Sequence, residues 1–155
     1  MRLNFVFCEL NRADFPAYVQ LCARRWPRAV LTVSFVAPST DLVPRDRTLV
    51  PRYSEVKPYL GEGLRVARQL GAQVVGFESV CGLPFCQIPG DAAALFDLPE
   101  IPLDADRSEF VREQACGDCA LGSRCWGLRR GYAELYGTGE LVAVPPRLGR
   151  DSPER

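Results

Sequence analysis

Apolar positions in the first half of the chain alternate between two kinds of spacing. Three short runs of apolar, β-branched and aromatic residues have the length and composition of buried strands: residues 3–8, 30–36 and 73–79. After the first run, apolar residues recur at helical spacing: Phe15, Val19, Cys22 and Trp26. A second helix is expected over residues 54–70, with one apolar face: Val56, Leu60, Leu64 and Ala67. The order β-α-β-α-β predicts an α/β fold, a parallel sheet with covering helices.

Residue types that start and stop helices lie at the ends of the helical segments. Asn11 and Asp14 are candidate N-caps for the first helix, and Pro27 ends it. Pro58 fits the second helix only within its first turn. Gly71 has the place of a C′ glycine, which ends a helix in the left-handed conformation.

The pattern changes after residue 79. Residues 80–110 are rich in Pro, Gly and Asp, so we expect an irregular segment that a bound cofactor helps to order. A short helix is expected over 126–136, ended by Gly137. Two further segments are expected to be non-helical: a long loop over 37–52 and an extended piece over 139–145. The chain thus divides into three predicted parts: an α/β unit over 1–79, a cysteine-rich region over 80–146 and a disordered tail over 147–155.

Composition narrows the class of protein. A chain of 155 residues with 47% hydrophobic residues can bury one ordinary core, with little left for a second full domain. Nineteen basic and nineteen acidic residues cancel, so no overall charge points to a nucleic acid or a membrane as partner. No apolar run approaches the about 20 residues that span a bilayer. We therefore expect neither nucleic-acid binding nor membrane insertion.

Seven cysteines and the absence of histidine restrict any metal site to sulfur and oxygen ligands. Four of the cysteines form the pattern C-x29-C-x2-C-x5-C: Cys86, Cys116, Cys119 and Cys125. Because a two-residue spacer lets one turn aim two sulfurs at one centre, Cys116 and Cys119 are expected on the same metal. Four thiolates suit either a tetrahedral zinc ion or an iron–sulfur cluster, and the spacing leaves both open.

The other thiols have simpler interpretations. Cys8 and Cys22 lie in apolar runs, where cysteine packs as a small hydrophobic residue. Cys81 lies five residues before Cys86 and is an additional candidate ligand. Disulfides are the competing interpretation, but they need an oxidising compartment, and seven thiols leave one unpaired. The first residues lack a signal-peptide pattern, so we expect a cytoplasmic protein with reduced thiols.

Five stretches between residues 3 and 146 carry a further signal: Asn4-Phe-Val-Phe, Asn11-Arg-Ala-Asp-Phe, Leu31-Thr-Val-Ser-Phe-Val, Gly82-Leu-Pro-Phe-Cys86, and Cys116-x2-Cys119-x5-Cys125-Trp-Gly, followed by Gly131-Tyr, Tyr136-Gly and Glu140-Leu. Together they resemble the C-terminal half of a radical SAM protein. The group in question carries a cysteine-rich region after a partial (β/α)6 barrel. The cysteine stretch is the most specific part of this resemblance.

The resemblance implies a fold and a cofactor. Residues 1–79 would be the C-terminal part of the partial barrel, and an auxiliary [4Fe–4S] cluster would have four ligands, with zinc as the alternative: Cys86, Cys116, Cys119 and Cys125. The C-x3-C-x2-C loop of this family, whose cluster cleaves S-adenosylmethionine, occurs nowhere in the 155 residues. S-adenosylmethionine would then bind only with a missing N-terminal half. We expect an oxidoreductase-like fragment that is not catalytic alone, with a complementing half-barrel chain as its partner.

The resemblance also implies roles for other residues. Backbone amides near three glycines would donate hydrogen bonds to the cluster: Gly117, Gly122 and Gly127. Trp126 and Tyr132 are expected to pack over the cluster rather than to react. Asn11 and Ser34 lie where the barrel would meet S-adenosylmethionine or substrate, with capping and packing as the alternative. Glu78 is the one carboxylate inside a predicted apolar strand, and a solvent-facing strand end is its alternative.

Two further interpretations stay open. The chain is either a small zinc-stabilised α/β module that acts in binding or as a scaffold, or a truncated product with no separate function. Three parallel strands with two helices would leave an apolar edge and face uncovered. That open surface favours self-association along the edge, or a place within a larger architecture.

Overall fold

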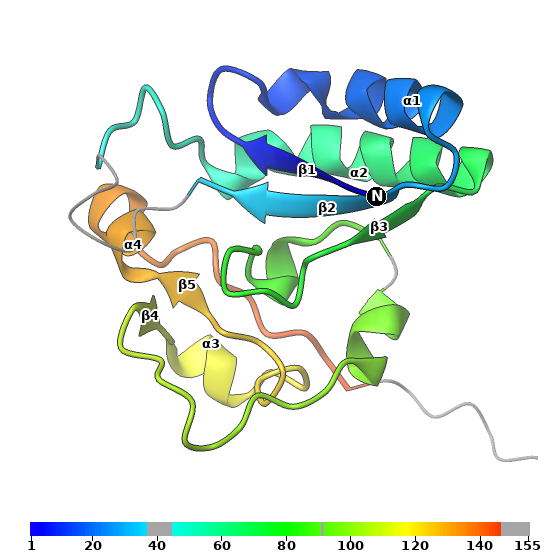
Figure 1. Ribbon diagram of the computed structural model, residues 1–155. Coiled ribbons are helices and arrows are strands. Elements are labelled where there is room, and N and C mark those ends of the chain that lie inside the picture. The colour runs from blue at the N-terminus through cyan, green and yellow to red at the C-terminus, as the bar shows by residue number, and fades with distance from the viewer. Residues whose placement is uncertain (37–44, 91, 147–155) are drawn as a thin grey trace, which may run out of the picture.

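The computed structural model describes residues 1–36, 45–90 and 92–146, and its first half is a layer of helices on a sheet (Figure 1). Three parallel strands form the sheet, in the order β1-β2-β3: β1 (Arg2–Phe7), β2 (Val30–Phe35) and β3 (Gln73–Val75). Two helices pack together on one face of it: α1 (Phe15–Arg25) and α2 (Tyr53–Leu70). The predicted α/β class and the parallel β-α-β-α-β order are confirmed.

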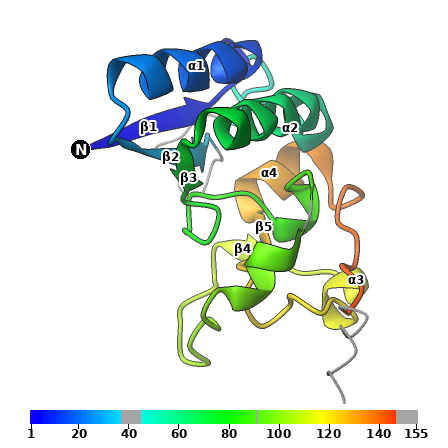
Figure 2. The same ribbon diagram turned by 90° about the vertical axis from the view of Figure 1, so that its right-hand side faces the viewer.

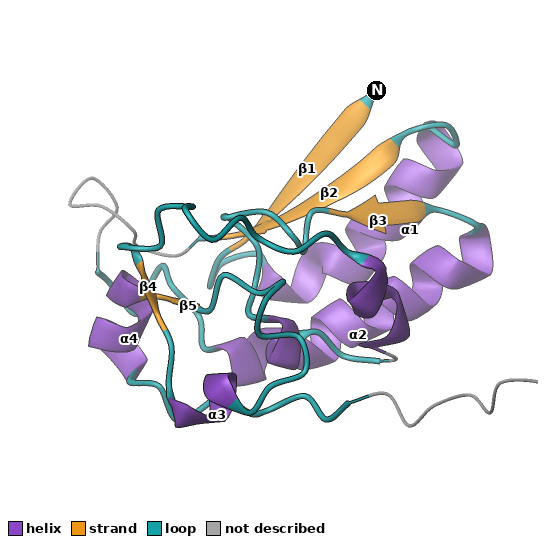
Figure 3. Cartoon of the chain, turned by 90° about the horizontal axis from the view of Figure 1, so that it is seen from below, coloured by secondary structure: helices purple, strands orange, loops and turns teal. Residues whose placement is uncertain are grey.

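The two faces of the sheet differ in burial. Alternate side chains of β1 and β2 point to the helices and are buried: Phe5, Phe7, Leu31, Val33 and Phe35. The residues between them face the opposite side, where those of β1 are exposed and those of β2 half-buried: Arg2, Asn4, Val6, Thr32 and Ser34. This side of β1 lies open when the sheet is viewed from below (Figure 3). The open face expected from the sequence is present along β1, but it is partly polar rather than apolar.

A close approach of α1 and α2 completes the buried side. A Cβ atom on Gly63 of α2 would come within 2.2 Å of the Phe15 ring at the start of α1. Phe15 in turn packs between Phe5 and Phe7, with ring centroids 5.1 and 5.0 Å away. Three residues of the predicted α1 stripe are buried: Phe15, Val19 and Cys22. Trp26 is 41% exposed, because the helix ends at Arg25 and the backbone turns away.

The ends of α2 confirm one prediction and correct another. Gly71 follows the helix with φ of 66°, the left-handed conformation expected of a C′ glycine. Pro58, however, lies inside the helix and not in its first turn. Because proline has no N–H, the Ser54 carbonyl loses its helical hydrogen-bond partner there.

Strand β3 is shorter than the predicted strand over 73–79. It ends at Val75, and Gly76 follows with φ of 104°. A Cβ atom on Gly76 would lie 2.8 Å from the Val33 carbonyl oxygen, so only glycine fits this close turn beside β2. Glu78 therefore lies in the turn after the strand and not in the strand itself.

The cysteine-rich region forms a second layer below the sheet (Figures 1 and 2). It is built from short pieces: 3-10 helices Phe85–Gln87 and Ala92–Asp97, β4 (Phe110–Val111), α3 (Gln114–Gly117), β5 (Leu128–Arg129) and α4 (Arg130–Tyr136). The helix predicted over 126–136 begins only at Arg130, because β5 pairs with β4 in antiparallel fashion just before it. Gly137 ends α4 with φ of 73°, as expected.

The N-terminus of α2 joins the two layers. The Tyr53 N–H donates to the Tyr132 hydroxyl oxygen at 2.9 Å, and the Ser54 N–H donates to the Glu140 carboxylate at 3.0 Å. The Tyr132 hydroxyl donates to the same carboxylate. The first N–H groups of a helix have no partner within it, so residues from the second layer cap α2 here.

Two sequence predictions fall wholly or partly outside the described residues. They concern the tail over 147–155 and the loop over 37–52, of which 45–52 is described. Within the described ranges, no helix is both long enough and apolar enough to cross a lipid bilayer.

Candidate metal centre

Four of the seven cysteines line one cavity in the second layer. They are the four selected by their spacing: Cys86, Cys116, Cys119 and Cys125. Cys86 lies in the 3-10 helix Phe85–Gln87 and Cys116 in α3, while the other two lie between α3 and β5. The fold thus brings two segments that are distant in sequence to the same place.

A glycine turn folds the second cysteine segment back on itself. The Gly122 N–H donates to the Cys119 carbonyl at 2.9 Å. A Cβ atom on Gly122 would lie 3.0 Å from the carbonyl oxygens of both Cys116 and Cys119. Glycine is therefore required where the chain between Cys119 and Cys125 passes close to its own backbone.

The C-terminal segment supplies N–H groups to two of the sulfurs. The Val144 N–H donates to the Cys119 sulfur at 3.3 Å, and the Val144 carbonyl accepts the Ala120 N–H at 2.9 Å. The Val142 N–H donates to the Cys86 sulfur. The extended piece predicted over 139–145 therefore forms no strand but lies along the cysteine loop.

The remaining N–H donors come from residues next to the cysteines. The Gln87 side-chain amide lies 3.6 Å from the Cys86 sulfur. Backbone N–H groups of Phe85 and Gly127 donate to the Cys125 sulfur. Of the three glycines expected to donate hydrogen bonds to a cluster, Gly127 is the one whose N–H lies against a cysteine sulfur. Hydrogen bonds to sulfur are a common feature of thiolate-bound metal sites.

Burial and hydrogen bonding act in opposite directions on two of the thiols. Burial raises the pKa of both Cys86 and Cys125, while the N–H groups described above lower it. Negative charge on neighbouring cysteines raises the pKa of both thiols further. Metal ligation requires thiolates, and a bound cation would reverse the repulsion among them.

Arg112 adds positive charge beside the cysteines. It lines the same cavity, and its guanidinium donates to the Gly122 carbonyl at 2.9 Å and to the Cys116 carbonyl at 3.4 Å. None of the described residues that line the cavity is acidic. A cation that also holds the loop in place is favourable beside a group of thiolates.

The donor set suits a sulfur-ligated metal or cluster, although the side chains are not gathered tightly. In the part of the chain that the structure describes, no group of three or more Cys, Asp or Glu side chains lies close enough to hold a metal ion. Four thiols, N–H donors to sulfur and a neighbouring guanidinium are nevertheless the chemistry that such a centre uses. The candidate site is therefore defined by the four cysteines that line one cavity and by the N–H groups that donate hydrogen bonds to their sulfurs.

The other three cysteines lie away from this cavity. Cys22 is 1% exposed within the α1 core, as expected of a small hydrophobic residue. Cys8 follows β1 and is half-buried. Cys81 is exposed and does not line the cavity, and its carbonyl accepts the Phe35 N–H at 2.8 Å.

Asn11 and Ser34 make local contacts near the ends of their strands. The Asn11 side chain accepts the Cys8 N–H and donates to the Val6 carbonyl, both at 2.9 Å, which closes the turn after β1. It makes no N-cap hydrogen bond to the following helix. Ser34 donates to the Asn4 side chain at 3.2 Å across the open face of the sheet. These contacts agree with the packing alternative for both residues.

Glu78 and the two aromatic residues also have structural contacts. The Glu78 carboxylate accepts the Gly76 N–H at 3.2 Å, and its carbonyl accepts the Trp126 ring N–H at 3.2 Å. Trp126 stacks on Phe110 with centroids 5.3 Å apart. Tyr132 is fully buried and belongs to the main core between the layers.

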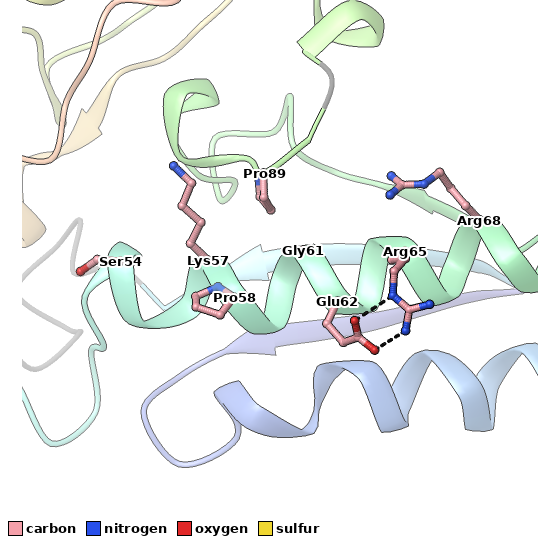
Figure 4. Close-up of a pocket in the computed structure, with 8 residues that line it drawn as sticks. All are labelled: Ser54, Lys57, Pro58, Gly61, Glu62, Arg65, Arg68 and Pro89. Carbon is pink, nitrogen blue, oxygen red and sulfur yellow. Dashed lines mark hydrogen bonds and ion pairs between the residues drawn. The ribbon is translucent and has the colours of Figure 1, made fainter.

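A second hollow runs along the outer side of α2 (Figure 4). Its residues include Lys57, Arg65, Arg68 and Pro89, and the Glu62 carboxylate accepts two hydrogen bonds from Arg65. None of the residues that line this hollow was predicted from the sequence as a metal ligand or a site residue. The cysteine cavity is therefore the candidate functional site.

Three groups around this site were missed by sequence reasoning: Gln87, Arg112 and Glu140. Gln87 is only 4% exposed, and its amide also donates to the Glu140 carbonyl. Its position beside Cys86 was the available signal, because a polar residue next to a candidate ligand is a natural second donor. Arg112 and Glu140 had no comparable signal in the spacing.

Comparison of the chain with protein-family models, with curated proteins and with solved structures found no match. Fold and site together define an α/β protein with a four-cysteine cavity beneath a small parallel sheet. Its function is inferred from the residues of that cavity.

Proposed function

We propose that this chain binds an auxiliary [4Fe–4S] cluster, as the C-terminal part of a radical SAM-type protein. One observation carries the proposal, namely that the thiols selected by spacing line a single cavity. The proposed ligands are Cys86, Cys116, Cys119 and Cys125. N–H groups that donate to three of these sulfurs support it, because such bonds stabilise thiolate and cluster charge.

The residues around the cavity would control what the cluster does. A cluster bound there supplies one-electron transfer or a coordination position for a substrate. Arg112 would offset part of its negative charge. Phe85 and Leu121 belong to a small apolar core against which Cys119 and Cys125 pack, and this core would limit access of water.

We further propose that the sheet is the last part of a partial barrel, which another half-barrel completes. Three parallel strands in sequential order, with both helices on one side, support this arrangement, because a barrel has its helices outside. The polar residues Asn4 and Ser34 would then face the interior. S-adenosylmethionine cleavage would need the other half, since the chain has no C-x3-C-x2-C segment.

A photoreactive side chain in place of Ser34, activated in cells, tests the partner. Capture of a chain that carries C-x3-C-x2-C is the expected result. Capture of a second copy of this chain alone would contradict a complementing half-barrel.

Structural zinc is the second candidate for the same four cysteines. A set of four thiolates and no other ligand is a common composition for closed structural zinc sites. The chain would then be a small α/β module for binding or scaffolding. The donors to sulfur support zinc as well as a cluster.

Metal analysis of protein purified without oxygen separates the two candidates. We expect about four irons and about four sulfides per chain, with the broad visible absorption of an iron–sulfur protein. Colourless protein with stoichiometric zinc would overturn the cluster and favour the zinc module. Protein without either metal would contradict both.

A further inference from the structure

The hollow along the outer side of α2 continues into a second hollow, which is lined by residues of α2, of β3 and of the 3-10 helix Ala92–Asp97. Arg68 and Pro89 line both hollows, so the two form one groove. The first part has a volume of about 590 Å³ and the second part about 420 Å³. Both parts are open to solvent. This α2 groove lies apart from the cysteine cavity and shares no lining residue with it.

The first part of the α2 groove is basic. Three cations line it, and Figure 4 shows two of them, Lys57 and Arg68, on either side of Pro89. The third, Arg65, is paired with Glu62, the one acidic residue among the described residues that line this part. The side chains of Lys57 and Arg68 form no ion pair with any residue that the structure describes. Two positive charges are therefore available to an anionic ligand.

The second part of the α2 groove is apolar. Five of its lining side chains are apolar: Leu64, Val74, Phe77, Ile88 and Leu95. All of them except Leu95 are half-buried, so each keeps part of its surface open to the groove or to solvent. No acidic side chain lines this part within the described ranges. A bulky apolar side chain of a ligand would gain free energy from burial here, beside the Arg68 guanidinium.

The charges of the molecule are divided unequally between its two layers. Residues 1–36 and 45–75, which form the sheet and its helices, contain eleven Lys or Arg and only five Asp or Glu. Residues 76–90 and 92–146 contain five Lys or Arg and ten Asp or Glu. The balanced total charge, from which the sequence predicts no charged partner, therefore conceals a basic helix layer. Such a layer attracts acidic partners over a distance and orients them as they approach.

We propose that the α2 groove binds a short acidic segment of a partner protein. Carboxylates of the segment pair with Lys57 and Arg68, and a bulky apolar side chain of the segment occupies the apolar part. An open groove suits a peptide chain, whereas sites for small molecules enclose most of their ligand. The apolar part favours a protein over a nucleic acid, because a phosphate backbone offers nothing to bury there. This inference is independent of whether the cysteines bind a metal.

Selection from a random peptide library, with the full chain as bait, identifies a defined probe. We expect the enriched peptides to combine acidic residues with a leucine or an aromatic residue. Replacing that leucine or aromatic residue by alanine should weaken binding of the peptide to the chain, measured by fluorescence anisotropy. Absence of enrichment over a surface without protein, or enrichment of peptides without acidic residues, would overturn the proposal.

Charge reversal in the groove tests where the selected peptide binds. Lys57→Glu together with Arg68→Glu should weaken its binding by about tenfold or more, because two attractions become repulsions. The matched control, Arg24→Glu together with Arg28→Glu, changes the net charge equally at exposed residues that do not line the groove. It should change the affinity by less than about twofold, because salt screens charges that are not in contact. Glutamine at positions 57 and 68 removes the two charges without reversing them and should also weaken binding.

Two further results would contradict the proposal. Equal losses of affinity in the groove variant and in its control would show general attraction to a basic protein and no groove. Equally tight binding of a single-stranded DNA oligonucleotide with the same charge as the peptide would favour a nucleic acid as the ligand. Circular dichroism of each variant verifies that the fold is kept.

Discussion

The residues around the cysteine cavity differ in whether their place in the site can be predicted from the sequence. The four thiols have a spacing that selects them from the sequence, and they line one cavity. The donors to their sulfurs have no such pattern, because every residue except proline has a backbone N–H and only folding directs it. Val142 and Val144 belong to this second kind, since they meet Cys86 and Cys119 only in the folded chain.

Cys119→Ala tests the ligand assignment. The change removes one thiol of the C-x2-C pair and the acceptor of the Val144 N–H. We expect loss of nearly all bound metal, measured as metal per chain after desalting, and faster hydrogen exchange over residues 80–140. Cys22→Ala is the control: it should keep the metal and lower the free energy of unfolding by about 1 kcal/mol. Equal metal loss in both variants would contradict the assignment.

At the scale of elements, α2 connects the two halves of the molecule. One side packs on α1 at Gly63, and its N-terminus takes its caps from Tyr132 and Glu140. Its amphipathic spacing predicted the helix and three of its buried residues, Val56, Leu60 and Ala67, whereas Leu64 is only half-buried. Two of its cap partners, Tyr132 and Glu140, lie about eighty residues away and leave no local signal. The position of Pro58 inside α2 was likewise not predicted from the local sequence. Packing of α2 on α1 and the sheet outweighs the one helical hydrogen bond that proline removes.

Gly63→Ala probes the contact between the helices. The added Cβ would overlap the Phe15 ring, so we expect a loss of about 1–3 kcal/mol in the free energy of unfolding. Gly61→Ala in the same helix is the matched control. There the new Cβ would lie 3.3 Å from the Pro89 side chain, and the change should be neutral or stabilising by up to about 1 kcal/mol. Urea unfolding followed by circular dichroism measures both, and equal losses would contradict the packing argument.

Glu140→Gln probes the cap of α2 through pH. Burial by itself would raise the pKa of Glu140, but hydrogen bonds from Tyr132 and Ser54 outweigh it and hold that pKa below its usual value. The carboxylate therefore stabilises the fold above the pKa it has when unfolded, and this stabilisation is lost as pH falls through the folded value. We expect the stability difference between the two proteins to shrink on acidification from pH of about 6 to about 3. A constant difference would contradict the charged cap.

At the scale of the whole molecule, the two layers draw their order from different sources. The upper layer has an aromatic core around Phe5, Phe7 and Phe15. In the described part of the cysteine region, Leu83, Leu128 and Tyr132 join the main core. The rest consists of short elements around a small separate core, against which Cys119 and Cys125 pack. A region with few buried apolar residues depends more on a bound centre for its order.

Treatment with a chelator, which would remove the proposed metal centre, tests whether the cysteine layer depends on that centre for its order. We expect amide exchange to speed up by about tenfold or more over residues 80–146, which corresponds to about 1.4 kcal/mol of local stability. Exchange in β1, β2 and α1 should stay nearly unchanged. Mass spectrometry of peptic fragments measures both. A similar acceleration in the upper layer would show that the two layers open as one unit.

The sequence by itself determined the alternation of strands and helices and the parallel order of the strands, because hydrophobic periodicity is a property of neighbouring residues. It also selected the four cysteines, because their spacing along the chain can be read without the fold. Tertiary structure decided where β3 stops. The chain turns at Gly76, which lies so close to the Val33 carbonyl that a side chain would not fit there. It also decided which distant residues cap α2 and which N–H groups reach the sulfurs. Each of these depends on segments that are far apart in the chain and meet only when the two layers pack.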